Sequence, residues 1–452
     1  MKDSVRILVP TGMLGAGFPA EIVERGLALG ADVIAVDGGS TDSGPHYLGT
    51  GTAKTTAAAV ERDLRILLGA ASSAGIPLIV GSCGTSGTDS GVDWVAGIVR
   101  SIVDEDGLSL RIAAIYSEQQ PADLKERLDR IHPLAPHGDL DPSTLESCEH
   151  IVAMMGHEPI ADALAAGADV VLAGRATDTA VAAAFPLMHG MPAGPTWHAA
   201  KIVECGAQCT TNPRSSGVFA TIDATGFTVE PLDPDVACTP HSVAAHMLYE
   251  TVNPFEMREP AGTLQVGDAV YTALDDRRVR VEGSRFEIAE QYTNKLEGAR
   301  ITGYETMSFT AIRDPHILGQ ITTWADLLRR VLVDRVTQTL GLGADDYAFD
   351  IRLYGFDAIL ADIDPDTRPP REVGVMLLVN AADQQTATAI AKIANPLMLH
   401  LPTPDMPYLP SLAFPFSPAE TERGAAYEFV LNHVVDVDSP TALFRTTLEV
   451  TA

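Results

Sequence analysis

The chain has 452 residues, of which 46% are hydrophobic and 20% charged, and its formal net charge is −29. This excess of negative charge disfavours a nucleic-acid partner, which requires a basic surface. It does not exclude an anionic small-molecule substrate, because a few arginines can create a local positive pocket. At this length a globular chain usually forms more than one core, so two domains are expected.

Targeting signals are not apparent in the sequence. The first residues lead straight into an apolar strand pattern without a secretory leader, and no run approaches the roughly 18 apolar residues of a membrane span. The cysteines form an odd, sparse set, which is typical of a reducing compartment. They are Cys83, Cys148, Cys205, Cys209 and Cys238. We therefore expect a cytoplasmic protein without a membrane partner.

Strand and helix patterns alternate in the first half of the chain. This alternation predicts a Rossmann-like α/β fold with a mainly parallel, doubly wound sheet. Apolar strand patterns cover residues 5–10, 33–36, 77–80, 109–115, 151–155 and 169–172. Hairpin-like strands replace this order after about residue 215 and favour an α+β second domain. The expected domains are residues 1–215, which carry the glycine-rich loops, and 216–452.

A glycine-rich loop follows the first predicted strand. Residues 11–17 have the pattern GxxGxG. Dinucleotide-binding folds carry GxGxxG at this place, and a lone glycine loop is weak evidence for a cofactor. We therefore predict no cofactor.

A short polar motif, Thr-Asp-Ser/Thr, follows a predicted strand three times. Its three copies are centred on Asp42, Asp89 and Asp178. Open α/β sheets place ligands at the carboxyl ends of their strands, so the three loops predict one shared pocket. The alternative is that each motif caps the helix that follows it.

Several side chains in these loops suit acid–base chemistry. If Asp42 and Asp89 converge, one carboxyl can hold a proton while the other stays charged, and His46 can assist. Arg175 suits a carboxylate or phosphate of the substrate, with a structural ion pair as the alternative. Cys83 suits a nucleophile, with a small buried residue as the alternative. The further predicted substrate contacts are Ser40, Thr41, Ser43, Thr88, Ser90, His157 and Asp178.

Metal-ligand patterns are weak in the sequence. Glu204, Cys205, Cys209 and His198 are close in sequence, but Cys-x₃-Cys without a second pair is not a convincing zinc pattern. His241 and His246 are five residues apart, which does not place both on one helix face. An oxygen-ligand site from the three loop aspartates is conceivable. We predict no metal.

Long motifs of the chain resemble one known family. They include GHEPIADALAAGADVVLAGRATDT at 156–179, WHAAKIVECG at 197–206 and CTPHSVAAHMLYE at 238–250. These stretches resemble the acyclic terpene utilisation (AtuA) family. The resemblance implies catabolism of branched acyclic terpenoids through CoA thioesters, and it does not specify a reaction.

Three functions are consistent with these patterns. The first is a lyase, a hydratase or dehydratase acting on a small branched or unsaturated carboxylate or its CoA thioester. The second is a hydrolase or acyl-transfer enzyme that depends on Cys83. The third is a non-catalytic subunit of a catabolic complex. We expect a homo-oligomer, with a small partner subunit as a further possibility.

Overall fold

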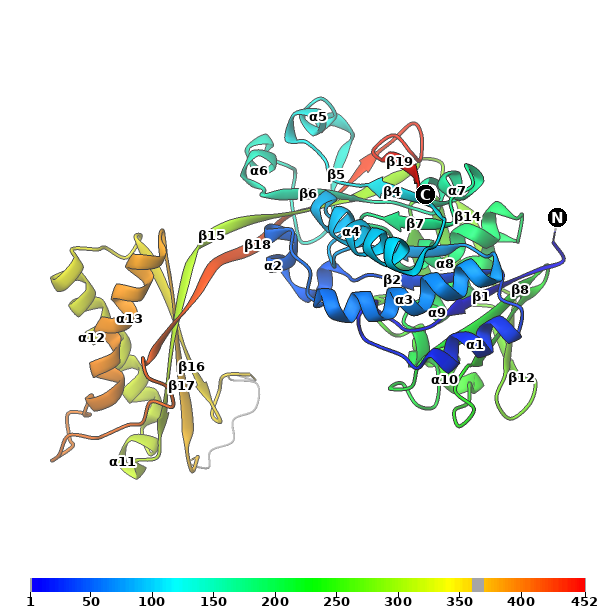
Figure 1. Cartoon of the computed structure of the whole chain (residues 1–452). Helices are drawn as coiled ribbons and strands as arrows, with labels where there is room; N and C mark the ends of the chain where they lie inside the picture. The colour runs from blue at the N-terminus through cyan, green and yellow to red at the C-terminus, as the bar shows by residue number, and fades with distance from the viewer. Residues whose placement is uncertain (1, 360–369, 452) are drawn as a thin grey trace. The chain divides into compact units, whose positions relative to one another are not determined.

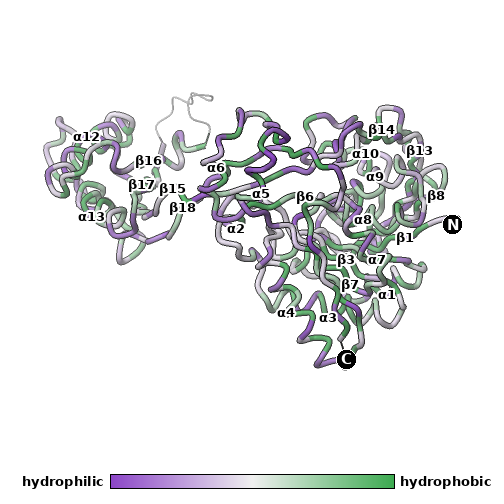
Figure 2. Tube along the Cα trace, turned by 90° about the horizontal axis from the view of Figure 1, so that it is seen from above, coloured by the Kyte–Doolittle hydropathy of each residue, from purple (hydrophilic) through white to green (hydrophobic). Residues whose placement is uncertain are grey.

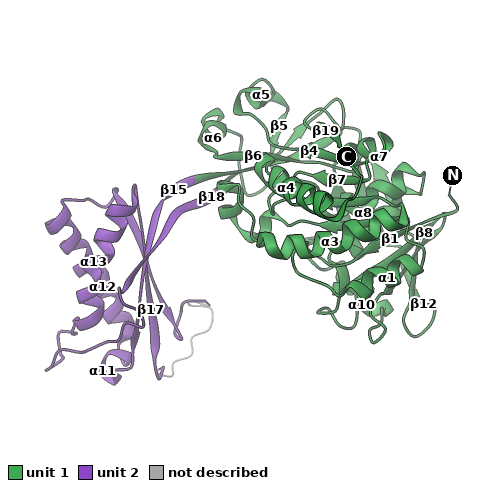
Figure 3. Ribbon diagram, viewed as in Figure 1, with its two compact units in different colours: residues 1–300, 429–452 green, residues 301–428 purple. Residues whose placement is uncertain are grey.

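The computed structural model describes residues 2–359 and 370–451. The chain forms two compact units, residues 1–300 with 429–452 and residues 301–428 (Figure 3). The division does not fall at the predicted position near residue 215, because the strands that follow this point hydrogen-bond to the first sheet and extend it. The second unit begins only in the long strand β15 (Thr293–Ile312).

Five parallel strands form the centre of the main sheet in unit 1 (Figure 1). In spatial order they are β1 (Ser4–Val9), β2 (Val33–Asp37), β3 (Leu78–Gly81), β7 (Val170–Ala173) and β4 (Arg111–Tyr116). Antiparallel strands extend the sheet on both sides. They are β8 (Val218–Asp223), β9 (Gly226–Pro231), β13 (Val279–Glu282) and β12 (Val270–Ala273) beyond β1, and β19 (Arg445–Val450) beyond β4.

Helices cover both faces of this sheet, which confirms the predicted doubly wound α/β fold. Successive strand residues point to opposite faces: Leu8 and Ile34 pack in one apolar cluster, whereas Ile7 and Val33 pack in the other. The first cluster includes α1 (Ala20–Ala28), α3 (Ala57–Ala74) and α4 (Asp89–Asp106). The second includes α7 (Glu158–Ala165), α8 (Asp178–Met188) and α9 (Ala193–Val203). The apolar strands are the green segments near β1, β3 and β7 in Figure 2.

The remaining elements of unit 1 are short. β6 (His150–Met154) pairs with β15 and not with the parallel strands. A separate three-stranded sheet contains β10 (Glu256–Glu259), β11 (Gly262–Gln265) and β14 (Arg285–Ile288). The others are η1 (Thr41–Ser43), α2 (Pro45–Thr50), α5 (Pro121–Lys125), η2 (Leu128–Arg130), β5 (Ile131–Pro133), α6 (Pro142–Ser147), η3 (Gly206–Cys209) and α10 (Pro240–His246).

Unit 2 is an antiparallel sheet packed against helices, in agreement with the predicted α+β class. Its strands are β16 (Tyr347–Tyr354), β17 (Val373–Ala381) and parts of β15 and β18 (Glu420–Asp436). Its helices are α11 (Pro315–Leu318), α12 (Ile321–Leu340) and α13 (Gln384–His400). Alternate residues of β17 are buried, and they pack in one apolar core with α12 and α13. This period of two is typical of a strand with one covered face.

None of the helices in the described ranges combines the length and the hydrophobicity that crossing a membrane requires.

Candidate functional site

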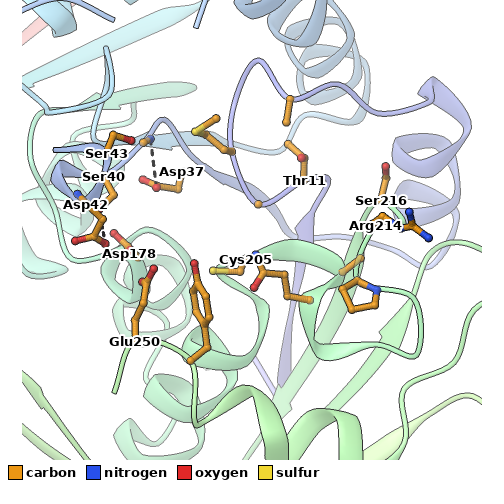
Figure 4. Close-up of a pocket in the computed structure, with 18 of the residues that line it drawn as sticks. Thr11, Asp37, Ser40, Asp42, Ser43, Asp178, Cys205, Arg214, Ser216 and Glu250 are labelled. Carbon is orange, nitrogen blue, oxygen red and sulfur yellow. Dashed lines mark hydrogen bonds between the residues drawn. The ribbon is translucent and has the colours of Figure 1, made fainter. Parts of the chain in front are cut away.

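A cavity of about 610 Å³ lies in unit 1, beside the carboxyl ends of β1 and β2 (Figure 4). The loop after β1 contributes Thr11, and β2 ends at Asp37. Asp178 is the first residue of α8, which follows β7. The other walls come from the segments after α9 and α10. Strand ends in an open α/β sheet are the usual place for a ligand.

Asp37 lines this cavity and is only 9% exposed. One carboxylate oxygen accepts a hydrogen bond from the Gly39 amide (3.3 Å), whereas Oδ1 is buried without a hydrogen-bond partner. Burial and the nearby charge of Asp178 raise the pKa of Asp37 well above its usual value, although Arg175 opposes this. The raised pKa favours the protonated form of Asp37, and a protonated carboxyl at this place can donate a proton into the cavity.

The glycines after Asp37 allow the chain to turn tightly here. A Cβ on Gly38 would lie 2.6 Å from the carbonyl oxygen of Gly81. Gly39 has φ of +143°, and a Cβ there would lie 2.5 Å from Cα of Thr85. Side chains at these positions would push the loop away from β3, so the glycines hold the loop close to the sheet.

Asp178 is the second acid of the cavity. Its side chain is 26% exposed and lies 3.6 Å from Nη1 of Arg175. Burial raises its pKa, Arg175 lowers it, and the charges of Asp42 and Glu250 raise it further. Figure 4 shows the carboxylates of Asp42, Asp178 and Glu250 grouped on one side of the cavity. The cavity thus gathers like charges, an arrangement that favours proton sharing among them.

Arg175 is buried and held by protein side chains. Its Nε lies 2.9 Å from Oε2 of Glu297, and its Nη2 donates to the hydroxyl of Thr41 (3.3 Å). Burial would lower the pKa of Arg175, but Glu297 and Asp178 raise it. Burial would raise the pKa of Glu297, but Arg175 and Lys295 lower it to about 2. The predicted substrate anchor is therefore a structural ion pair, the alternative left open by the sequence.

Two other cations face the cavity. Lys54 donates to the hydroxyl of Ser43 (3.1 Å), and Arg214 is also part of the cavity lining. Neither side chain forms an ion pair with the described residues. Ser40, a further predicted contact, also lines the cavity and donates to Oδ2 of Asp42 (2.9 Å). Lys54 and Arg214 are therefore the groups best placed to receive an anion.

Asp89 does not meet Asp42 in this cavity. Its carboxylate accepts from the amide of Glu118 (3.1 Å) and lies 3.6 Å from Arg445. His46 is exposed on α2, with its ring edge-on to Tyr47, and it is not among the cavity residues. The expected carboxylate pair of Asp42 and Asp89 is absent because the second loop turns toward β4 and β19.

Cys83 is fully buried, with 0% exposure. Its thiol lies 3.7 Å from the carbonyl oxygen of Val80, and burial and the charge of Asp37 raise its pKa. A nucleophile needs an accessible thiolate. The structure therefore does not support the predicted nucleophile, and Cys83 is a core residue.

Three more predicted contacts have structural roles. The Thr88 hydroxyl caps α4 by accepting from the Gly91 amide (3.2 Å), and Ser90 donates to the Gly51 carbonyl (3.0 Å). His157 precedes α7 and packs edge-on against Trp197, and burial lowers its pKa. The Thr-Asp-Ser motif centred on Asp89 therefore caps a helix, which is the alternative role that the sequence left open for these motifs.

A cluster of potential metal ligands lies beside the cavity. One ligand atom each from Glu204, Cys205 and His246 lies within 4.8 Å of the other two. Burial and the charge of Lys201 lower the pKa of His246 to about 4, so its imidazole is neutral at neutral pH. The other suggested ligand His198 is buried elsewhere and hydrogen-bonds Ser284 (2.7 Å).

Several cavity residues were not identified from the sequence. These are Asp37, Lys54, Arg214, Tyr249 and Glu250. Asp37 had a local signal, since an acid that ends an apolar strand before two glycines is suited to a sheet-edge site. Tyr249 and Glu250 had no such signal, because they follow α10, far along the chain.

Fold and site together define an α/β protein with an acidic cavity at the carboxyl ends of its parallel strands. The sequence model of the acyclic terpene utilisation family protein AtuA matches residues 51–407. The chain belongs to this family, which gives it a catabolic role in the use of acyclic terpenes. No significant match was found among curated proteins or among solved structures.

Proposed function

We propose that this protein is a hydro-lyase that adds or removes water at a small branched or unsaturated carboxylate or its CoA thioester. The proposal rests mainly on the Asp37–Asp178 pair. Two carboxyls with raised pKa values interact electrostatically in one cavity, above a buried arginine. Groups of this kind perform general acid–base catalysis near neutral pH.

The pair provides a balanced proton path for hydration. Asp178 takes a proton from water as the water oxygen bonds to the β-carbon of the double bond. Asp37 gives its proton to the α-carbon. The proton then on Asp178 returns to Asp37, and dehydration runs these steps in reverse. Asp37 is better suited than Asp178 to act as the general acid, because its carboxyl is the more deeply buried of the two.

The size and charge of the cavity favour a small acid. Its volume of about 610 Å³ lies within the usual range for small-molecule sites. Lys54 and Arg214 face four carboxylates in the lining, those of Asp37, Asp42, Asp178 and Glu250. Two cations suffice for one substrate carboxylate, whereas the phosphates of CoA would need further positive charge outside the cavity.

Turnover in deuterated water tests this function. Branched 2-alkenoates, their 3-hydroxy acids and the CoA thioesters of both are incubated with the protein, and NMR follows deuterium entering the α-carbon. We expect Asp37→Asn and Asp178→Asn to lower kcat by about 10²–10⁴-fold. Asp104→Asn, which changes an exposed acid on α4, is the control and should retain activity.

Two results would contradict the proposal. One is full activity in Asp37→Asn with an intact fold. The other is no turnover of any panel substrate together with co-purification of a partner enzyme, which would favour a non-catalytic subunit.

A further inference from the structure

Three side chains with different ligand atoms meet at one wall of the cavity. Glu204 caps the C-terminus of α9, Cys205 follows it, and His246 is the last residue of α10. One ligand atom from each lies within 4.8 Å of the other two. We propose that Glu204, Cys205 and His246 bind a divalent transition metal of the zinc class.

The types of ligand select this class of metal. A thiolate and an imidazole prefer zinc and similar ions, whereas calcium and magnesium prefer oxygen ligands alone. Three protein ligands leave one position of a tetrahedral ion open, as catalytic zinc sites do. Cys205 also lines the cavity, so the open position would face a water or a substrate oxygen there.

His246 provides the independent observation. It is 4% exposed, and its Nε2 is buried without a hydrogen-bond partner. Buried polar atoms are nearly always satisfied, so an unpaired one calls for an explanation. The ring is held in place, since it stacks on Tyr249 with centroids 5.7 Å apart and planes 15° apart. An imidazole fixed in this way, with one ring nitrogen unpaired and a ring nitrogen within 4.8 Å of a thiol and a carboxyl oxygen, is suited to receive a metal.

Lys201 offers a competing explanation for part of the cluster. Its Nζ lies 2.5 Å from Oε1 of Glu204, so the ammonium already balances that carboxylate. This ion pair leaves Nε2 of His246 unsatisfied and does not involve Cys205. The second oxygen of Glu204 remains available to a metal while Lys201 holds the first.

The geometry needs only a small closure. Tetrahedral zinc with its usual bond lengths separates its ligand atoms by roughly 3.2–3.6 Å. The three ligand atoms already lie within 4.8 Å of one another, so no pair has to approach by more than about 1.6 Å. Cys205 is only partly buried, so its side chain is the least confined of the three.

Cobalt binding tests the site without any substrate. The full-length protein is stripped with a chelator and titrated with Co²⁺, whose bond to a thiolate gives a near-ultraviolet charge-transfer band. We expect about one equivalent to bind with this band. Cys205→Ala should abolish the band, and Glu204→Gln and His246→Gln should each weaken binding at least about tenfold.

Cys148→Ala is the matched control, because it removes another partly buried cysteine of unit 1 that lies outside the cluster. Absence of a saturable band in the wild-type protein would overturn the proposal, as would a band that persists in Cys205→Ala. Anomalous diffraction from zinc-soaked wild-type crystals is independent of whether the variants fold. A peak bonded to all three side chains supports the site, and a peak only elsewhere overturns it. Because substrate is absent, failure here leaves the hydration assay unaffected.

Discussion

Nε of Arg175 lies 2.9 Å from Oε2 of Glu297, and the side chains are 5% and 7% exposed. The pair joins the loop after β7 to β15, across 122 residues of sequence. Thr41 donates to both oxygens of Glu297 (3.2 Å each) and accepts from Arg175. These contacts fix three separate segments of unit 1 to one another, so the contacts of Arg175 are structural.

Removal of one partner from this pair should destabilise unit 1 strongly. Glu297→Gln leaves a buried guanidinium without its main countercharge, and we expect a loss of about 3–5 kcal/mol in the free energy of unfolding. The double variant Arg175→Met, Glu297→Leu removes both charges and should recover much of this loss. Urea unfolding measures both variants. The exposed ion pair of Arg278 and Asp275 serves as control, and Asp275→Asn should have little effect. If Glu297→Gln lowered the free energy of unfolding as little as Asp275→Asn does, the structural role of Arg175 would be contradicted.

Because the pKa of Asp37 is raised in the folded protein, the free energy of unfolding should fall as pH rises. Because the folded pKa is raised, Asp37 contributes fully below the unfolded value of about 3.9, and this contribution is lost as pH rises through the folded pKa. Asp37→Asn cannot ionise, so its stability relative to the wild-type protein should increase from pH 5 to pH 9. Urea unfolding across this range measures the effect, with Asp104→Asn as a control that keeps the wild-type slope. A slope that is unchanged in Asp37→Asn would show that Asp37 is ionised in the folded protein.

The parallel centre of unit 1 could be predicted because its signals are local. Short apolar runs followed by glycine or by a capping Thr-Asp pair mark β2, β3 and β7 in the sequence. The same signals located the loops of Ser40, Asp42 and Asp178, which the structure brings to one cavity. They could not separate the cavity loop of Asp42 from the capping loop of Asp89, because the two motifs are nearly identical.

Long-range partners account for what the sequence did not show. Arg175 depends on Glu297, which lies in β15, a 20-residue strand whose residues belong to both units. The metal-ligand cluster joins the adjacent Glu204 and Cys205 to His246, and this spacing matches no short motif. The division into units also depends on pairing across distance, since β8 returns to β1 and keeps residues 216–300 in unit 1.

The cysteines should differ sharply in their reactivity. Cys83, Cys209 and Cys238 are buried, whereas Cys148 and Cys205 are partly exposed. In the native protein we expect at most two thiols to react with a disulfide reagent within minutes, and all five to react after unfolding. Cys83→Ala should retain activity, because its thiol does not reach the cavity. Rapid modification of Cys83 in the folded protein, identified by peptide mass, would contradict its burial.

The His150–Glu118 pair should stabilise the protein most at mildly acidic pH. Nδ1 of His150 lies 2.6 Å from Oε1 of Glu118, and the side chains are 25% and 18% exposed. The hydrogen bond to Glu118 raises the pKa of His150, so this contribution is complete below about 6.5 and is lost as pH rises through the raised value. Burial acts to raise the pKa of Glu118, but His150 lowers it, and the net shift is downward. The stability contributed by the charged Glu118 is therefore present above about 4.5 and is lost as pH falls through its lowered pKa.

His150→Gln should therefore cost about 1–2 kcal/mol at pH 6 and less at pH 9, as expected for a charged hydrogen bond that is partly screened. Urea unfolding at the two values measures the cost, and NMR titration of the wild-type protein follows the His150 ring. His132→Gln is the control, since His132 is 52% exposed and pairs with Asp436 at the surface. A cost that is larger at pH 9 than at pH 6 would show that the neutral imidazole, not the ion pair, provides the stabilisation.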